Sequence, residues 1–450
     1  LFKKQSTEER RNMILNGNIL STLLFLSIPT LMVGIIQALI PLSDGLFLNN
    51  LGGVLVASSV SFSQPILNIM IALSQGLGVA AAMAMIGKLY GRGIIRAVKE
   101  TTLQIFVFSF LVGLGLIPVC IFLAFFIAKF TTPEIKQYVF IYISLYSLVI
   151  PFNFLASIYN AAKNSVGRPE VPFIRVFILL ILKIIFNTIF LYFLRMGIVG
   201  AVLATLCSYI VVTIWMYHEL FIKKDEMRLE LKKYKFIAPI VKKLLRIGFP
   251  SMISYMLIYL GFFLINKEVE HYGAVALNAQ GIASNINSIC FILPASIGTT
   301  VTSMISMNLG IGNIEKSKKI FYCGITTSIV IALFIIASTL PFSNVFTLSF
   351  TREKAVLDIA NRALNIYTYS VIGFGIFCVC QGVFIALART KVPMFMSILR
   401  IWFFRYLFIL FTKSTLGLYS VFWGNLFSNL LAGTVFFILV LNIDWNKNYS

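Results

Sequence analysis

Long apolar runs recur along the whole chain and alternate with short polar segments. A helix needs about 20 apolar residues to cross the hydrocarbon core of a bilayer, and we count twelve runs of about this length. The pattern therefore predicts an all-α polytopic membrane protein. The predicted spans are Leu20–Leu48, Val54–Ile86, Thr102–Ala128, Tyr138–Ala162, Val171–Leu194, Met196–Tyr217, Ile247–Asn266, Ala274–Met307, Ile320–Phe342, Ala363–Leu387, Val392–Phe411 and Leu416–Leu441.

Composition and charge agree with this interpretation. The chain has 450 residues, of which 59% are hydrophobic and 12% charged, and its net charge is +21. If the N-terminus is cytoplasmic, 25 of the 37 Lys and Arg fall in inner segments, eight in outer loops and four in spans. This asymmetry follows the positive-inside rule, so both termini are predicted to be cytoplasmic. Topology thus explains most of the positive charge, and we expect no binding of nucleic acid.

The two halves of the chain are predicted to be repeats. Landmarks in matching contexts recur at an offset of 221 residues, and KLYGRG (88–93) matches MNLGIG (307–312) with a shift of two residues. Each half has six spans, so both keep one orientation in the membrane, as in transporters whose substrate site lies between two halves. The matching pairs are Pro29 and Pro250, Gly52 and Gly273, and Pro172 and Pro393.

The repeat and the basic segment between its copies predict the domain organisation. A stretch rich in Lys and Arg, Lys223–Arg246, separates the halves and has an amphipathic part suited to the membrane surface. The predicted division is a cytoplasmic arm over 1–18, a six-helix lobe over 19–221, a basic cytoplasmic linker over 222–246, a second six-helix lobe over 247–443 and a cytoplasmic tail over 444–450.

The first span carries the most unusual chemistry. Asp44 is the only one of the 16 Asp and Glu that we place inside a span. A carboxylate in hydrocarbon is unfavourable by several kcal/mol, so such a residue usually marks an ion or substrate pathway. Pro29 and Pro41 lie in the same predicted helix, and each removes a backbone donor and frees a carbonyl one turn back. We therefore expect helix kinks at both prolines, where the freed carbonyls find partners or line a wet cavity.

An enzyme is not expected. Catalysis within the spans would need paired groups such as histidines, two carboxylates or a serine with a base. The two histidines lie near span ends, and the six cysteines lie within apolar runs. We predict no cofactor and no metal site beyond a transported Na⁺. A channel is disfavoured, because parallel repeats with one asymmetric carboxylate favour alternating access.

Several motifs, taken in order, resemble one family of transporters. They are IPTLMVGIIQALIPLSDGLFLNNLGG, SQGLGVAAAMAMIGKLYGRG, the GRPEVP turn and LKIIFNTIFLYFLRMGIVGAVLATL, with NLGIGN and ALARTKVP in the second half. Over nearly the whole chain this order resembles the MATE (multidrug and toxic compound extrusion) family of bacterial efflux transporters. The resemblance implies twelve helices in two pseudo-symmetric six-helix lobes. It also implies antiport, in which a drug-like, often cationic, compound leaves while H⁺ or Na⁺ enters.

The resemblance further implies a coupling-cation site in the N-terminal lobe. Asp44 matches the aspartate of the family's first span, and Asn187 in IIFNTIFL matches the asparagine of the fifth. Thr205 in VLATL matches a threonine of the family's sixth span if the loop between spans five and six is four residues shorter in this chain than in the family. The predicted topology independently puts all three in the outer half of the membrane, at 1.5 Å of rise per residue.

The chain departs from the family pattern at two positions. Leu191 stands where the family often has a second aspartate, and Ile265 stands opposite Asp44 in the repeat. One carboxylate therefore remains where several are usual. A single buried carboxylate suits a proton, because burial raises its pKa, although Asn, Thr and backbone oxygens can also help to bind Na⁺. Both coupling ions stay open.

Lys183 is a candidate coupling partner. It lies one helical turn before Asn187 and shares its face. One hypothesis is that Lys183 pairs with Asp44 in one conformational state and replaces the cation. The alternative is that Lys183 extends to the cytoplasmic edge of the membrane.

Polar residues within the spans are candidates for lining a substrate cavity, or for linking helices by hydrogen bonds. Arg400 and Arg405, near the start of a span, are interpreted as anchors at the membrane surface. Together with Arg175 and Lys183, they alternatively suit a flippase for a lipid-linked or anionic lipid substrate. The candidate cavity residues are Gln37, Gln64, Asn68, Asn153, Tyr255, Gln280 and Asn285.

The expected function is therefore export of amphipathic, cationic organic compounds in antiport with H⁺ or Na⁺. The expected partners are small organic substrates and membrane lipids, and the protein is expected to be a monomer. Its expected location is the bacterial plasma membrane, which the chain crosses many times.

Overall fold

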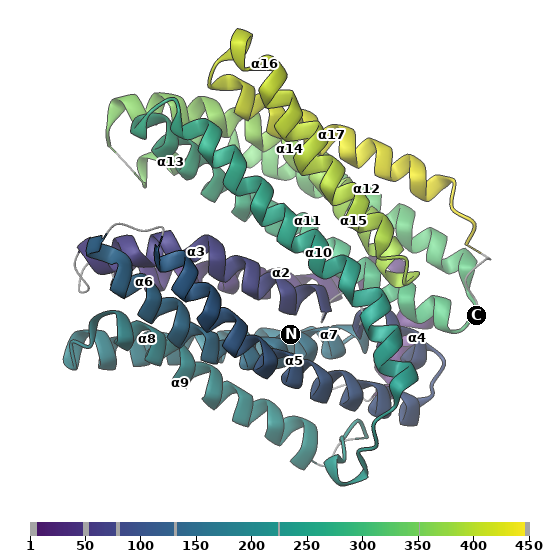
Figure 1. Cartoon of the computed structure of the whole chain (residues 1–450). Coiled ribbons are helices and arrows are strands. Elements are labelled where there is room, and N and C mark those ends of the chain that lie inside the picture. The colour runs from purple at the N-terminus through teal and green to yellow at the C-terminus, as the bar shows by residue number, and fades with distance from the viewer. Residues whose placement is uncertain are drawn as a thin grey trace. The chain divides into compact units, whose positions relative to one another are not determined.

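The computed structural model describes residues 7–47, 54–77, 82–129, 133–223, 226–350 and 352–445. Helices dominate this part of the chain (Figure 1). Eleven of them are long and apolar enough to cross a membrane, and they correspond to eleven of the twelve predicted spans. The remaining prediction, Val54–Ile86, includes residues outside the described part. The prediction of an all-α membrane protein is confirmed.

The first half of the chain begins with the short helix α1 (Thr7–Asn16) and the long helix α2 (Ile19–Phe47). The predicted linker contains the short turn η6 (Leu231–Lys233), and the next long helix begins within it at Ala238. The other elements of this half are α3 (Val54–Gln75), α4 (Met83–Gly91), α5 (Ile95–Lys129), α6 (Pro133–Tyr146), η3 (Ser147–Val149), α7 (Ile150–Ser165), α8 (Glu170–Asn187), η4 (Thr188–Phe193), α9 (Gly197–Tyr217) and η5 (His218–Ile222).

The second half contains long and short helices and one π-helical segment of nine residues, η7. Its elements are α10 (Ala238–Glu270), α11 (Ala274–Gly310), α12 (Ile314–Thr339), α13 (Ser343–Leu348), α14 (Lys354–Ala386), α15 (Lys391–Ile398), η7 (Leu399–Leu407), α16 (Phe408–Leu416) and α17 (Tyr419–Leu441).

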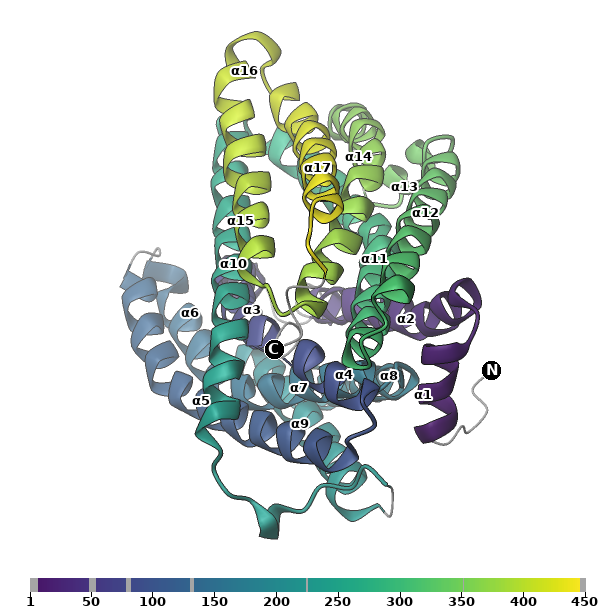
Figure 2. The ribbon, with the colours of Figure 1, turned by 90° about the vertical axis from the view of Figure 1, so that its right-hand side faces the viewer.

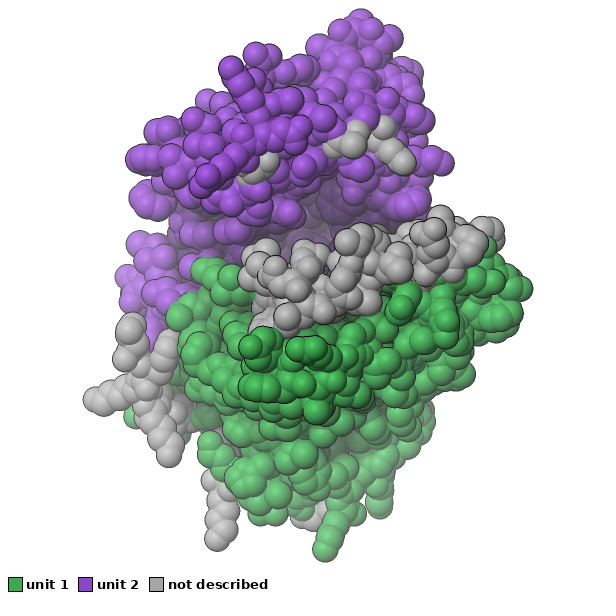
Figure 3. Space-filling model, turned by 90° about the vertical axis from the view of Figure 1, so that its left-hand side faces the viewer, with its two compact units in different colours: residues 1–11, 32–255 green, residues 12–31, 256–450 purple. Residues whose placement is uncertain are grey.

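Two compact units make up the chain (Figure 3). Unit 1 contains residues 1–11 and 32–255, and unit 2 contains residues 12–31 and 256–450. One boundary falls within α1, and the other two fall within α2 and α10, shortly after Pro29 and Pro250. These are the prolines that the repeat offset pairs, so the chain passes between units at corresponding points of its two halves.

Unit 1 is built from pairs of neighbouring helices. α5 packs against α6 and α7, α3 packs against α6, and α8 packs against α9. The Lys163 ammonium lies 2.6 Å from the Glu219 carboxylate, and the Tyr159 hydroxyl also donates to Glu219. This buried ion pair fixes the end of α7 against η5.

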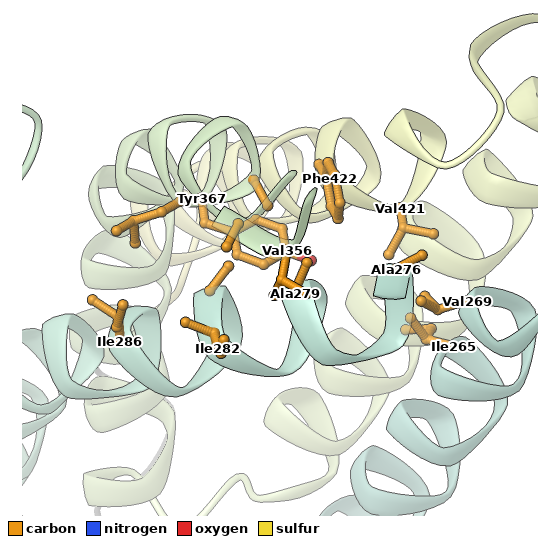
Figure 4. Packing of buried hydrophobic residues seen from close by; sticks show 14 of the residues in the cluster. Ile265, Val269, Ala276, Ala279, Ile282, Ile286, Val356, Tyr367, Val421 and Phe422 are labelled. Atoms are coloured by element: carbon orange, nitrogen blue, oxygen red, sulfur yellow. The ribbon is translucent and has the colours of Figure 1, made fainter. Parts of the chain in front are cut away.

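Unit 2 is organised around α14, which packs against α11, α12 and α17. Figure 2 shows α14 and α17 side by side. Ala276, Ala279 and Ile282 of α11 meet Tyr367 of α14 and Phe422 of α17 in the apolar core of this unit (Figure 4). The small alanine side chains allow α11 to approach its neighbours closely.

Glycines bring helix backbones into contact in unit 2. A Cβ on Gly298 of α11 would lie 2.7 Å from the Cys378 carbonyl oxygen of α14. A Cβ on Gly382 of α14 would lie 2.7 Å from the Gly298 carbonyl oxygen. Gly373 of α14 and Gly433 of α17 make a similar close approach. Small residues at such crossings are typical of helix packing in membranes.

The repeat is also visible in the backbone where helices end. At the end of α7, Gly167 has φ 70° and donates to the Asn164 carbonyl at 3.0 Å. At the end of α14, Ala388 has φ 63° and donates to the Ile385 carbonyl at 2.8 Å. Both ends have the hydrogen bonds of a Schellman motif. The predicted pairing of GRPEVP with ARTKVP therefore corresponds to one shared turn.

Candidate functional site

Helix α2 carries Asp44 near its end and runs through Pro29 and Pro41. Pro29 is buried. The side chains of Asp44, Pro41 and Gln64 lie outside the described part of the structure. The coupling role of Asp44 and the kinks at the two prolines therefore stay predictions.

Lys183 and Asn187 lie on the inner face of α8. Their side chains are 4% and 0% exposed, whereas Ile184 and Ile185 beside them are 42% and 47% exposed. The polar face of this helix thus points into unit 1, and the apolar face points outward. The alternative in which Lys183 extends to the membrane surface is wrong.

The helical register changes directly after Asn187. Residues Thr188–Phe193 form the π-helical segment η4, and Leu191 within it is 3% exposed. π-Helical turns are rare and frequently occur at functional sites. Sequence reasoning missed this segment, because an unbroken apolar run gives no sign of a change in register. Leu191, in place of a second carboxylate, presents an apolar side chain to the interior.

Thr205 lies on α9, the helix that packs against α8 and η4. Its side chain is 4% exposed, and its hydroxyl donates to the Ala201 carbonyl at 3.0 Å. The hydroxyl oxygen keeps its acceptor capacity, since this bond uses only the proton. Lys183, Asn187 and Thr205 are therefore all in the interior of unit 1, on neighbouring helices.

A second polar group in unit 1 joins α7, α8 and α9. The Tyr209 hydroxyl donates to Asn153 Oδ1 at 2.9 Å, and Arg175 Nε donates to Asn160 Oδ1 at 2.9 Å. Arg175 is 3% exposed. These bonds cross-link three helices, which is one of the two roles that the sequence left open for Asn153.

The other candidate cavity residues are scattered. Asn68 and Tyr255 are half-buried, and Gln280 is buried. Gln37 and Asn285 are exposed on the faces of their helices. The described residues do not place these side chains in one cluster, so their role in a substrate cavity stays a prediction.

Arg400 and Arg405 lie in the interior of unit 2, at 7% and 6% exposure. The interpretation of both residues as anchors at the membrane surface is wrong. Their position near the start of an apolar run suggested an interfacial location, but η7 turns them toward α14 and α17. Arg400 Nη1 donates to Asn429 Oδ1 of α17 at 2.9 Å.

The KLYGRG motif at the end of α4 lies outside the predicted spans and holds two perturbed groups. Burial lowers the pKa of Lys88 to about 8, and the nearby positive charges of Lys243 and Arg92 act in the same direction. Burial raises the pKa of Tyr90 to about 12. Gly93 has φ 76°, and a Cβ there would lie 3.3 Å from the Arg11 guanidinium carbon. This positive φ, which other residues rarely adopt, explains the glycine.

Comparison with known proteins identifies the family. The family model described as MatE matches residues 29–189 and 250–411. The chain belongs to the MatE family. The two matched segments begin at Pro29 and Pro250, the first pair of the predicted repeat. The prediction of a MATE-type transporter and not an enzyme is confirmed.

Relatives and solved structures extend this result. The chain is 26% identical over 387 residues to the probable multidrug resistance protein YoeA of Bacillus subtilis, covering 83% of each chain. It is 22% identical over 437 residues to the multidrug export protein MepA of Staphylococcus saprophyticus, covering 94% of each.

Among solved structures, the outward-facing conformation of a MATE family transporter of the MOP superfamily superposes with a TM-score of 0.90 at 21% identity. This match covers 97% of the present chain and 98% of the other. A MOP superfamily transporter of Pyrococcus furiosus matches with a TM-score of 0.88 at 21% identity, again over 97% of this chain and 98% of the other. For that protein, a reversed polarity of the binding pocket is said to suggest a different function. Both matches show that the chain has the MATE fold.

Proposed function

We propose that this chain is a secondary efflux transporter that exports amphipathic, cationic organic compounds in antiport with H⁺ or Na⁺ by alternating access. Relatives along most of its length are named multidrug resistance or export proteins. The observation that carries the proposal is the inward-facing pair Lys183 and Asn187, buried in a lobe of apolar helices. Polar groups are retained inside a membrane chiefly where they serve an ion or substrate pathway.

Asp44 is the coupling residue in this proposal, with Asn187 and Thr205 as neutral oxygen donors. Cation binding changes the access state only if the cation binds one conformation more tightly than the other. Lys183 supplies such a difference if its ammonium pairs with Asp44 when the cation is absent. The amphipathic substrate and the coupling cation then compete with the Lys183 ammonium for Asp44. When the cation is released, Lys183 pairs with the Asp44 carboxylate again.

The composition of the site favours a proton over Na⁺. Leu191 is an apolar, buried residue and offers no oxygen ligand. Na⁺ is a hard cation that needs several oxygen ligands, as Ca²⁺ and Mg²⁺ do, whereas one carboxylate is enough to hold a proton. A carboxyl group in an apolar interior also binds its proton near working pH.

A flippase for an anionic or lipid-linked substrate is the second candidate. The observation that favours it is the burial of Arg175, Lys183, Arg400 and Arg405, none of which is on the outer surface of its unit. Arg175 and Arg400, however, bond to amide side chains within their own units. The multidrug relatives favour the first candidate.

The membrane environment and partners of the protein follow from this proposal. The chain operates as a multi-pass protein of a bacterial plasma membrane with both termini in the cytoplasm. It works as a monomer, and its partners are the transported compounds and the surrounding lipids.

The test is efflux of the cationic dye rhodamine 123 from proteoliposomes. Wild type is compared with Asp44→Asn under an imposed proton gradient and, separately, under a Na⁺ gradient. We expect the proton gradient to drive export and Asp44→Asn to abolish it. Lys183→Met is expected to retain export but to alter its dependence on cation concentration. Export by the Asp44→Asn variant at the wild-type rate, or no export by wild type under either gradient, would refute the proposal.

A further inference from the structure

Two arginines share one side of a π-helical segment inside unit 2. Arg400 and Arg405 both belong to η7, in which hydrogen bonds join residues five positions apart. The two residues are separated by one such turn, so both side chains lie on the buried face. In an α-helix of 3.6 residues per turn, residues five apart would lie on different sides. The π-helix therefore puts both positive charges on the buried face of the segment.

The groups around Arg400 are neutral. Its guanidinium donates to Asn429 Oδ1 at 2.9 Å, and its central carbon lies 4.8 Å from the Phe377 ring and 5.3 Å from the Phe374 ring. Asn429 in turn donates to Asn425 Oδ1 at 3.1 Å. The amides and ring faces orient the guanidinium, but they do not neutralise its charge.

The groups around Arg405 are also neutral. Its guanidinium carbon lies 5.7 Å from the Phe262 ring, and the Tyr367 hydroxyl faces it. Gln280 and Ser284 lie beside the same hydroxyl. Hydroxyl and amide groups from α11 and α14 thus lie near this guanidinium.

Neither arginine forms an ion pair with any carboxylate of the described residues. Glu268, an acid of the same unit, is bound to Lys413 at 3.2 Å. The Nε atoms of Arg400 and Arg405 are buried and have no acceptor among the described atoms. Burying a charge without an opposite charge is unfavourable, and a guanidinium presents a planar fork that fits a carboxylate or phosphate. The arrangement is that of an anion site whose anion comes from outside the chain.

We propose that Arg400 and Arg405 form a binding site for the carboxylate, or a similar oxyanion, of an organic compound that this chain transports. The inference rests on the proposed export function, because it takes the anionic ligand to be cargo. It widens the substrate class from cations to zwitterions that carry a carboxylate. The two lobes then have complementary roles: Asp44 in the first lobe binds the coupling cation, and Arg400 and Arg405 in the second lobe bind the anionic end of the cargo.

A matched pair of dyes tests this site. Rhodamine 110 carries a free carboxylate, and rhodamine 123 is its methyl ester with the same cationic ring system. Binding to the purified full-length protein in detergent is measured by fluorescence anisotropy, without any gradient. We expect wild type to bind rhodamine 110 about tenfold more tightly than rhodamine 123, as for one charged hydrogen-bonded contact. Equal affinity of wild type for both dyes would overturn the proposal.

Single variants locate the preference. Arg400→Gln and Arg405→Gln are expected to lose most of the preference for rhodamine 110 while their affinity for rhodamine 123 stays unchanged. Arg362→Gln is the control, because Arg362 is an exposed arginine of the same unit that donates to the Tyr419 hydroxyl. An unchanged preference in both Gln variants would refute the assignment.

If a Gln variant does not fold, displacement of bound dye from the wild-type protein by a competing anion still tests the proposal. Sodium benzoate is expected to displace rhodamine 110 but not rhodamine 123. If phosphatidylglycerol displaces rhodamine 110 while benzoate does not, the site belongs to a lipid headgroup and the proposal is wrong. Intact dye preference without gradient-driven export would refute the proposed function alone. Export of rhodamine 123 without dye preference would refute the anion site alone.

Discussion

Gly167 and Ala388 adopt the same left-handed backbone conformation at matching points of the repeat, and glycine adopts it without strain. The two φ angles are 70° and 63°, and each residue donates the same short hydrogen bond to the helix end before it. A Cβ in this region crowds the following carbonyl and costs roughly 1–2 kcal/mol. The second half therefore carries strain that the first half avoids.

Replacing Ala388 with glycine is expected to raise the free energy of unfolding by about 0.5–1 kcal/mol, because the relief of strain exceeds the added flexibility of the unfolded chain. The measurement is reversible unfolding in mixed micelles. Gly167→Ala is the matched control and should lower the free energy of unfolding by about 1 kcal/mol. A loss of stability in Ala388→Gly would contradict the shared turn.

Lys88 makes stability depend on pH. Its folded-state pKa is about 8, below the ordinary lysine value of 10.5. Below pH 8 both folded and unfolded states are protonated, and the buried charge destabilises the fold. Between pH 8 and 10.5 the unfolded state binds more protons, so stability rises with pH. We expect a gain of roughly 1–3 kcal/mol over this window, reduced by partial exposure.

The control for this titration is Lys88→Met, which removes the group but keeps most of its apolar stem. The difference between wild type and the variant isolates Lys88 from the other lysines that titrate in the same range. The variant should be more stable than wild type at pH 7, and this advantage should shrink toward pH 10.5. A difference that does not change with pH would show that Lys88 is not the responsible group.

Two helices of unit 2 meet where a glycine of one lies against the backbone of the other. Gly298 of α11 lies against the Cys378 carbonyl of α14, and a Cβ there would be 2.7 Å from that oxygen. Gly281, on the same helix, has open space around the same position. The two glycines differ only in what lies opposite, so they form a natural pair for comparison.

Gly298→Ala is expected to lower the free energy of unfolding by about 1–3 kcal/mol, because the helices must separate to admit the methyl group. Gly281→Ala should leave stability unchanged or raise it by up to about 1 kcal/mol through better helix propensity. Unfolding of both variants in mixed micelles provides the comparison. Equal changes in the free energy of unfolding for the two variants would show that the crossing of α11 and α14 can admit a methyl group.

The π-helical segments η4 and η7 show which elements hydropathy cannot predict. Apolar runs predicted twelve spans, and eleven of these correspond to long apolar helices among the described residues, because a run of sufficient length is enough to define a helix in a bilayer. The apolar runs that contain η4 and η7 do not show that the helical hydrogen bonds change register after Asn187 and at Leu399. That change depends on packing with neighbouring helices, and it decides which side chains face the interior.

At the scale of the whole molecule, repetition was the most informative feature of the sequence. The 221-residue offset paired Pro29 with Pro250, and a unit boundary falls shortly after each. Family resemblance singled out Asn187 and Thr205, and the structure buries both side chains in unit 1. The resemblance did not predict that Arg400 is buried, because its hydrogen-bond partner Asn429 lies 29 residues later, on another helix. Contacts between helices of different spans cannot be derived from either span alone.

The buried arginines of η7 also affect the synthesis of the protein. The segment Lys391–Leu416 enters the membrane before α17 has been made, so Arg400 then lacks its Asn429 partner. An arginine near the centre of an inserting helix costs about 2.5–3.5 kcal/mol at the translocon. We therefore expect Lys391–Leu416 to insert poorly into the membrane by itself, and its stable insertion to require α17. The last two spans are expected to leave the translocon together as a helical hairpin. The Asn429 amide then enters the membrane together with the Arg400 guanidinium that donates to it.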